Sequence, residues 1–145
     1  KTNADVGGRI INKIIDDYVS QSSGDAIAFS SLGQLRYLSA LKYVDAVVGN
    51  SSSGICEAPS LKTATINVGD RQKGRIRALS TIDVDTNKKQ ILNALEHIYS
   101  ADFQNKLCNV VNPYGDGFTT QRIIDIIKNV NLRELNTKPF YDIKF

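Results

Sequence analysis

Short apolar runs of strand length alternate along this chain with longer segments whose apolar residues recur at helical spacing. The runs predict strands at residues 26–29, 46–49 and 64–68, and a strand or an extended connection at 80–84. Helices are expected from Gly8 to near residues 23–24, at 35–43, 53–61, 87–99 and 101–110, and from Thr119 or Thr120, as the capping residue, through Ile127. This alternation is typical of a parallel sheet covered by helices on both faces, so it predicts a doubly wound, Rossmann-like α/β domain.

The chain has the length of one ordinary domain, at 145 residues. We expect the domain to comprise residues 1–130. The segment 131–145 has no helical periodicity, yet it ends in a group of apolar residues, namely Phe140, Tyr141, Ile143 and Phe145. A free tail is normally more polar. We therefore expect this tail to pack on the domain or on another part of a longer protein.

Composition narrows the classes of partner. The formal net charge of +3 suits a small anionic ligand and gives no basis for predicting a nucleic-acid partner. No apolar run is long enough to predict a membrane span. Cys56, Cys108 and the single histidine, His97, do not have the spacing of a metal site. We expect two reduced thiols in a cytoplasmic protein that binds no metal.

The most informative stretch joins the expected strand at 46–49 to the expected helix at 53–61. It contains three consecutive serines, Ser51, Ser52 and Ser53, followed by Gly54. Backbone N–H groups at a helix N-terminus bind phosphate groups, serine hydroxyls add hydrogen bonds, and small residues let the phosphate approach. Helix capping is the alternative, but a cap needs only one such residue. The stretch therefore predicts an anion site at the carboxyl end of a strand, where parallel sheets bind ligands.

Two further features lie near this turn. Glu57 is one helical turn inside the expected helix, where it either accepts hydrogen bonds from a ribose diol or simply favours the helix dipole. The loop 69–77 follows the next strand and should open at the same edge of the sheet. It is either a solvated basic loop or a clamp for pyrophosphate made of Arg71, Lys73, Arg75 and Arg77. The chain has neither a GxxxxGKS/T nor a GxGxxG motif, which argues against a nucleoside triphosphatase or a dinucleotide-binding oxidoreductase.

Several short motifs occur in the order found in one enzyme family. They are Asn3-Ala4-Asp5 with Gly7-Gly8, Leu32-Gly33 before Tyr37-Leu38, residues 49–54 with Glu57, residues 67–75, and the turn Asn112-Pro113-Tyr114-Gly115-Asp116-Gly117. Together they resemble the hydrolysing UDP-N-acetylglucosamine 2-epimerases of sialic-acid and capsule biosynthesis. The resemblance covers nearly the whole chain. It implies the C-terminal domain of a two-domain fold, similar to B-type nucleotide-sugar glycosyltransferases, with the active site in the cleft between the domains.

The resemblance also implies roles for individual residues. Ser51 and Ser52 would contact the phosphates of UDP, and Glu57 would bind the ribose hydroxyls. Leu32 would meet the uracil, largely through its backbone. Arg71 would reach the nucleotide from the facing loop, and Asn3 would line the same cleft. Further contacts to the phosphates or the cleft are expected from Ser53, Gly54 and Arg75.

The reaction implied by the resemblance releases UDP by elimination and then adds water, which gives N-acetylmannosamine without a metal or other cofactor. The acid and base carboxylates of the family lie upstream of Lys1, so we assign no catalytic residue here and expect the isolated chain to be inactive. Expected partners are UDP, the UDP-sugar substrate, the N-terminal catalytic domain and further copies of the enzyme in a homo-oligomer.

Two alternatives remain open at this point: a domain of a B-type glycosyltransferase and part of a non-hydrolysing epimerase. The turn at 112–117 is similar to a motif of hydrolysing and non-hydrolysing epimerases and so favours an epimerase. The loop 70–75 departs from that of the non-hydrolysing enzymes and so favours the hydrolysing type. The sugar is contacted mainly by the other half of these enzymes, so this chain does not identify it.

Overall fold

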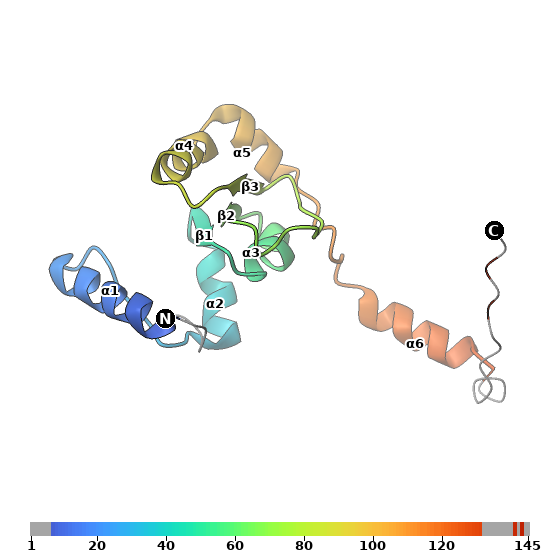
Figure 1. Ribbon diagram of the computed structural model, residues 1–145. Helices are drawn as coiled ribbons and strands as arrows, with labels where there is room; N and C mark the ends of the chain where they lie inside the picture. The colour runs from blue at the N-terminus through green and yellow to red at the C-terminus, as the bar shows by residue number, and fades with distance from the viewer. Residues whose placement is uncertain (1–6, 132–140, 142, 144–145) are drawn as a thin grey trace.

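The computed structural model describes residues 7–131, 141 and 143 (Figure 1). Its elements are α1 (Gly8–Gln21), α2 (Gly33–Leu41), β1 (Ala46–Gly49), α3 (Ser53–Cys56), the 3-10 helix η1 (Ala58–Leu61), β2 (Ala64–Val68), β3 (Thr81–Val84), α4 (Lys88–Ile98), α5 (Ala101–Cys108) and α6 (Thr119–Asn129). Most predicted elements are confirmed to within a few residues. The expected packing of the tail, residues 131–145, falls largely outside the described residues.

The three strands form one parallel sheet in the order β1-β2-β3, with β2 in the centre. Ala46 of β1 stands opposite Ala64 of β2. The predicted α/β class with a parallel sheet is therefore confirmed. The expectation of a strand at 26–29 is wrong, because this segment lies outside the described sheet and Ile27 is 75% exposed. A strand needs a neighbouring strand to supply its hydrogen bonds, and β1 is the edge of the described sheet.

The apolar core lies between the sheet and the helices α4 and α5, which Figure 1 shows on one side of the strands. Successive side chains of a strand point to opposite faces, so Ala64 and Ile66 of β2 reach this side together. They pack against a cluster of buried residues from the two helices, namely Ala94, Ile98 and Phe103. Ile66 and Ile98 are almost completely buried. This burial fixes the register of the central strand, because a slip of one residue would turn the polar neighbours into the core.

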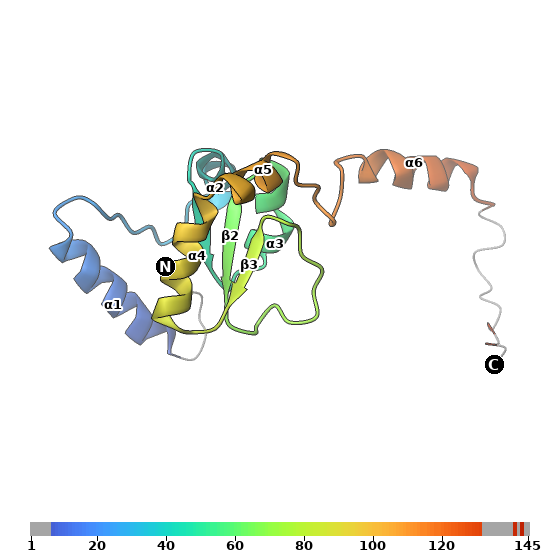
Figure 2. The same cartoon turned by 90° about the horizontal axis from the view of Figure 1, so that it is seen from above.

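The opposite face of β2 carries polar side chains and is covered by α3, as Figure 2 shows from above. Thr65 and Asn67 are nevertheless buried, at 2% and 1% exposure. The Thr65 hydroxyl donates to the backbone oxygen of Gly54 at 2.7 Å, and the Asn67 amide donates to Asp83 at 2.6 Å. These bonds satisfy the Thr65 hydroxyl and the Asn67 amide nitrogen, which would otherwise be costly to bury. The Thr65 bond attaches α3 to the central strand, and the Asn67 bond joins β2 to β3.

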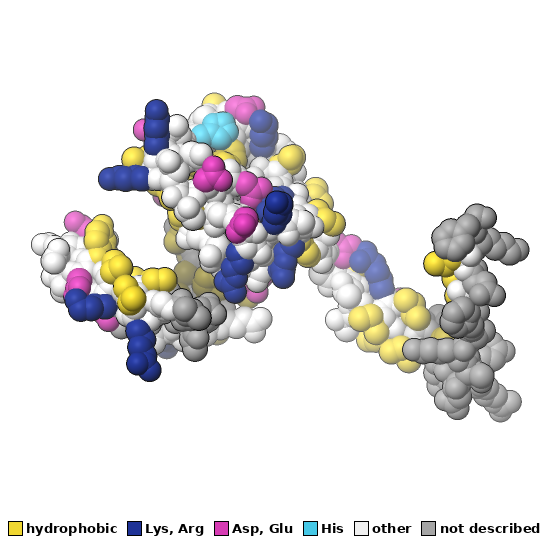
Figure 3. Space-filling model, viewed as in Figure 1, with side chains coloured by type: hydrophobic (Ala, Val, Ile, Leu, Met, Phe, Trp, Pro, Cys, Tyr) yellow, Lys and Arg dark blue, Asp and Glu magenta, His cyan; other side chains and the backbone are white. Residues whose placement is uncertain are grey.

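α1 and α6 extend away from the sheet (Figure 1). α6 has no buried residue, and hydrophobic side chains run along both helices on the face shown in Figure 3. Ile126 of α6 is 66% exposed. An amphipathic helix normally buries such an apolar stripe, so the described residues do not contain the surface that α6 would cover. No helix in the described part of the chain is long and apolar enough to cross a membrane.

The prediction that Thr119 or Thr120 caps the last helix is wrong. The capping position of α6 is Phe118, and no side chain at that position bonds the helix. Asp116 instead accepts a hydrogen bond from the Phe118 N–H at 3.0 Å and forms an ion pair with Arg122 one turn into the helix. The Arg122 guanidinium, followed by the Phe118 N–H, holds the pKa of Asp116 below its usual value. Asp116, in the turn before α6, thus stabilises the start of the helix in place of a capping threonine.

Candidate functional site

The serine turn follows β1 at the carboxyl edge of the sheet, as predicted. Ser51 accepts a hydrogen bond from the Ser53 N–H through its side-chain oxygen at 3.3 Å. Ser52 occupies the capping position of α3, but its side chain makes no capping bond. Capping therefore does not account for the Ser52 hydroxyl. Both Ser51 and Ser52 are exposed, so their hydroxyls are accessible to a ligand at this edge.

The expected helix at 53–61 is broken into α3 and η1, and this changes the electrostatics of the turn. Pro59 lacks the N–H that a continuous helix would use at this position, so the helix ends at Cys56 and resumes as a 3-10 turn. A helix of four residues has only a small dipole. An anion at the serine turn would therefore be bound by hydroxyls and local N–H groups more than by a helix dipole.

Glu57 lies at the joint between α3 and η1 and is held by hydroxyl groups. The Ser53 hydroxyl donates to Glu57 Oε2 from one turn earlier. The Tyr37 hydroxyl of α2 is hydrogen-bonded to the same Ser53 oxygen at 2.7 Å. A hydroxyl has one proton to donate, so Ser53 gives its proton to the carboxylate and Tyr37 donates to Ser53. The arrangement fixes one oxygen of Glu57, and among the described residues no hydrogen bond to Oε1 is found.

A cavity of about 730 Å³ lies beside this carboxylate. Glu57 lines it together with residues from the start of α2 and the segment before it, which include Phe29, Leu32, Gly33 and Tyr37. The structure thereby brings Leu32 and Glu57 to one cavity, although they are distant in sequence. Both are residues that the resemblance assigns to UDP. Asn3, which is expected to line the same cleft, lies outside the described residues.

The basic loop at 69–77 is tied to the serine turn by a residue that sequence reasoning missed. The Gln72 side chain is buried, at 3% exposure, and its amide donates to the backbone oxygen of Asn50 at 2.7 Å. Arg77 turns back on its own loop, where it donates to the backbone oxygen of Gln72 at 3.0 Å and pairs with Asp83 at 2.7 Å. A glutamine among charged residues gives no signal in the sequence, because its partner is a backbone atom far away along the chain.

The loop therefore does not act as a clamp of four equivalent cations. Arg77 is used within the protein, whereas Arg71, Lys73 and Arg75 are exposed. Gln72 holds the loop beside Asn50, the residue that directly precedes Ser51. Arg71 directly precedes Gln72, so its backbone lies close to the serine turn. Ser51, Ser52 and Arg71 thus belong to two adjoining loops at the same edge of the sheet, as the sequence predicts.

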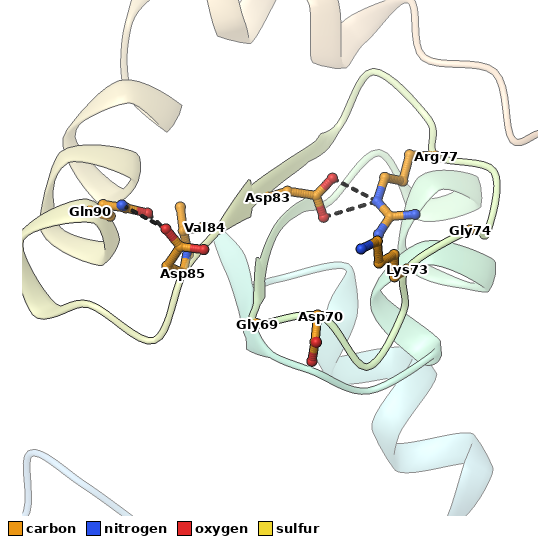
Figure 4. A pocket seen from close by; sticks show the side chains of 9 residues that line it. All are labelled: Gly69, Asp70, Lys73, Gly74, Arg77, Asp83, Val84, Asp85 and Gln90. Carbon is orange, nitrogen blue, oxygen red and sulfur yellow. Dashed lines mark hydrogen bonds and ion pairs between the residues drawn. The ribbon is translucent and has the colours of Figure 1, made fainter.

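A second cavity, of about 460 Å³, opens at the ends of β2 and β3 (Figure 4). Figure 4 shows the Arg77–Asp83 ion pair and the Gln90–Asp85 hydrogen bond within it. Arg77 and Asp83 of this cavity are thus paired with one another. Of the described residues that the resemblance assigns to UDP, none lines this cavity, although Lys73 and Arg77 of the basic loop do. Among the described residues, no three His, Cys, Asp or Glu side chains come together in a manner that suits a metal ion.

Comparison with known proteins gives a consistent result. A family model for UDP-N-acetylglucosamine 2-epimerase matches residues 1–128. A GDP/UDP-N,N'-diacetylbacillosamine 2-epimerase (hydrolyzing) of Campylobacter jejuni is 44% identical, over 99% of this chain and 37% of that protein. Polysialic acid biosynthesis protein P7 of Escherichia coli is 37% identical, over 98% of this chain and 36% of its own length. A UDP-N,N'-diacetylbacillosamine 2-epimerase (hydrolyzing) of Legionella pneumophila is 34% identical, over 90% of this chain and 33% of that protein.

A solved structure supports the same fold. The protein, from Listeria monocytogenes and assigned to the UDP-N-acetylglucosamine 2-epimerases, matches with a TM-score of 0.68 at 23% identity, over 91% of this chain and 36% of that one. The chain spans little more than a third of the length of the relatives that it matches. The resemblance expected from the sequence is confirmed, because the family model covers most of the chain: this protein belongs to the UDP-N-acetylglucosamine 2-epimerase family.

Proposed function

We propose that this chain is the UDP-binding C-terminal part of a longer, hydrolysing UDP-sugar 2-epimerase. The observation that carries the proposal is the meeting of Leu32 and Glu57 at one cavity beside the serine turn. In this proposal residues 1–130 form a doubly wound, Rossmann-like domain of a two-domain, B-type-glycosyltransferase-like fold. The segment 131–145 packs on this domain or on the N-terminal half. Membership of the epimerase family argues against the alternative, a domain of a B-type glycosyltransferase.

The proposed nucleotide lies across the carboxyl edge of β1. Glu57 accepts hydrogen bonds from the ribose hydroxyls through the carboxylate that Ser53 orients, and the backbone at Leu32 faces the uracil. A carboxylate next to a phosphate site would repel the ligand unless hydroxyl groups use it, which favours the ribose for Glu57. The phosphates then lie towards the serine turn and the basic loop, where the contacting residues are Ser51, Ser52, Ser53, Gly54, Arg71 and Arg75.

The chemistry belongs to the part of the enzyme outside this chain. Elimination of UDP requires acid and base groups within hydrogen-bond distance of the sugar, and we assign none to the residues here. This chain would hold UDP through the reaction and supply cationic groups for the diphosphate leaving group. In the full-length enzyme we propose the N-terminal catalytic domain and a homo-oligomer as partners. A cytoplasmic location fits the free thiols Cys56 and Cys108.

The hydrolysing type is supported by the names of the Campylobacter and Legionella relatives. The assay uses the full-length protein with UDP-N-acetylglucosamine alone, without an acceptor. Release of free UDP together with N-acetylmannosamine is expected. Release of UDP with the C2 epimer of diacetylbacillosamine, from the UDP-diacetylbacillosamine substrate alone, would reassign the sugar. Formation of UDP-N-acetylmannosamine without free UDP would show a non-hydrolysing epimerase and refute the hydrolysing proposal.

The ribose assignment has a separate test. A hydrogen bond to a charged group contributes about 1.5–3 kcal/mol, so wild-type protein should bind 2′-deoxy-UDP roughly tenfold or more weakly than UDP. In Glu57→Ala this discrimination should largely disappear. The four dissociation constants form a double-mutant cycle that isolates the contact between the carboxylate and the ribose. Glu96→Ala removes an exposed carboxylate from α4 and serves as the control for the change in net charge. If Glu57→Ala still prefers UDP as strongly as wild type, Glu57 does not bind the ribose.

A further inference from the structure

The turn at 112–117 is one of the motifs that resemble the epimerase family, but none of the proposed ligand contacts uses it. Its first residue, Asn112, reaches across to the α3–η1 joint. The Asn112 side-chain amide donates to the backbone oxygen of Cys56 at 2.8 Å and to the Ser60 hydroxyl at 2.6 Å. Cys56 directly precedes Glu57. Asn112 therefore fixes the backbone on which the proposed ribose-binding carboxylate is carried.

The same turn also reaches the basic loop. The Tyr114 hydroxyl donates to the backbone oxygen of Ile76 at 3.0 Å. Within the turn, the Tyr114 N–H donates to Asn112 Oδ1 at 2.9 Å, so the orientation of each side chain depends on the other. Ile76 directly follows Arg75. The turn is thus bonded through Asn112 to the segment of Glu57 and through Tyr114 to the segment of Arg75.

This geometry suggests how the two sides of the site keep their separation. Gln72 ties the middle of the basic loop to Asn50, and Tyr114 ties the end of the loop to the turn. With both bonds in place the loop has little freedom before a ligand arrives. A ligand that meets an ordered loop avoids the entropy cost of ordering it, and this raises affinity without any new contact.

We propose that Asn112 and Tyr114 are positioning residues of the nucleotide site, which set the distance between the ribose side and the phosphate side without touching the ligand. The inference rests on the proposed function, because it names the two sides by the parts of UDP that they bind. Tyr114 acts on the basic loop and so affects the phosphates. Asn112 acts beside Glu57 and so affects the ribose. If the turn had only a structural role, its variants would change the stability of the protein without separate effects on the binding of the phosphates and of the ribose.

The experiment compares UDP with uridine, which lacks the phosphates, as ligands of the full-length protein. Tyr114→Phe removes one hydroxyl and keeps the ring. Loss of one hydrogen bond that orders the loop should weaken UDP binding by about three- to tenfold and change uridine binding by less than about twofold. Tyr99→Phe is the matched control, because the Tyr99 hydroxyl also makes a single surface bond, to Asp45 at 3.1 Å, away from both segments. It should leave both affinities unchanged.

Asn112→Ala provides the second variant, and it should weaken UDP and uridine by similar factors because both carry the ribose. Circular dichroism and melting temperature show whether each variant is folded. A wild-type ratio of UDP to uridine affinity in Tyr114→Phe, with UDP still bound, would overturn the positioning role alone. If the wild-type protein binds neither ligand, the nucleotide site itself is refuted and the positioning role with it.

Discussion

Gly54 of α3 packs against Thr65 of β2, and its replacement by alanine tests how closely the serine turn is held on the sheet. A methyl group at this position would lie 2.5 Å from Thr65 Cγ2 and 3.3 Å from Thr65 Oγ1. Thr65 is 2% exposed and its hydroxyl is bonded to the Gly54 oxygen, so it has no room to turn away. Relief of the clash therefore requires α3 to move off the strand, and with it the serines that we place at the phosphates.

Two opposing effects decide the size of the change. Overpacking a buried site costs about 1–3 kcal/mol, and a contact as short as 2.5 Å belongs in the upper half of that range. Alanine in place of glycine favours a helix by at most about 1 kcal/mol, and by less in a helix of one turn. The clash should win. We expect Gly54→Ala to lower the free energy of unfolding by about 1–2 kcal/mol and to weaken UDP binding.

A second substitution identifies the obstacle. Thr65→Ser removes Cγ2 and keeps the hydroxyl that bonds the Gly54 oxygen. Alone it should cost about 1 kcal/mol, for one buried methyl group and the small cavity left behind. In the double variant the alanine methyl occupies the space of the lost one. Additive effects would destabilise the double variant by about 2–3 kcal/mol, whereas we expect it within about 1 kcal/mol of wild type.

The assay is urea denaturation of the full-length protein and its three variants, compared by midpoint at constant slope. UDP affinity, measured on the same samples, reports whether the serine turn has moved. A Gly54→Ala protein as stable as wild type would show that α3 does not rest on Thr65 in this way. A double variant whose loss equals the sum of the single losses would show that Thr65 Cγ2 is not the obstacle.

Two further changes test the elements around the site. Thr63→Val removes the buried hydroxyl that donates to the backbone oxygen of Leu41 at 2.6 Å, so it should lower the free energy of unfolding by about 1–3 kcal/mol. Thr63→Ser keeps the hydroxyl and should retain most of the stability. Arg122→Ala should raise the pKa of Asp116 towards its ordinary value, as followed by NMR of the carboxyl group. A lowered carboxyl pKa stabilises the fold above the unfolded pKa of about 3.9, and this stabilisation is lost as the pH falls through the pKa of the folded state. Because the pKa of Asp116 in the folded state is higher in Arg122→Ala, the start of α6 should loosen at a higher pH in this variant.

Local sequence predicted the elements whose periodicity is set by the core. The apolar run at 64–68 became β2 because Ala64 and Ile66 are buried beneath α4 and α5. The run at 26–29 has a similar composition and yet lies outside the described sheet, because strand formation depends on a neighbour that a local pattern does not reveal. The predicted site residues Leu32 and Glu57 do meet at one cavity. The links made by Tyr37, Gln72 and Asn112 join residues far apart along the chain, so no motif spacing could indicate them.

The break at Pro59 and the turn at 112–117 explain each other. In a continuous helix the Cys56 oxygen would accept a hydrogen bond from the Ser60 N–H, but Ser60 donates to the Glu57 oxygen in the 3-10 turn, at 3.1 Å. The break therefore leaves the Cys56 oxygen without its helical donor, and an unpaired backbone oxygen here would be costly. Asn112 supplies the missing donor. A proline that ends the helix at the proposed ribose-binding residue thus requires a partner from elsewhere in the chain, and the asparagine of the turn satisfies that requirement while it fixes the carboxylate beside it.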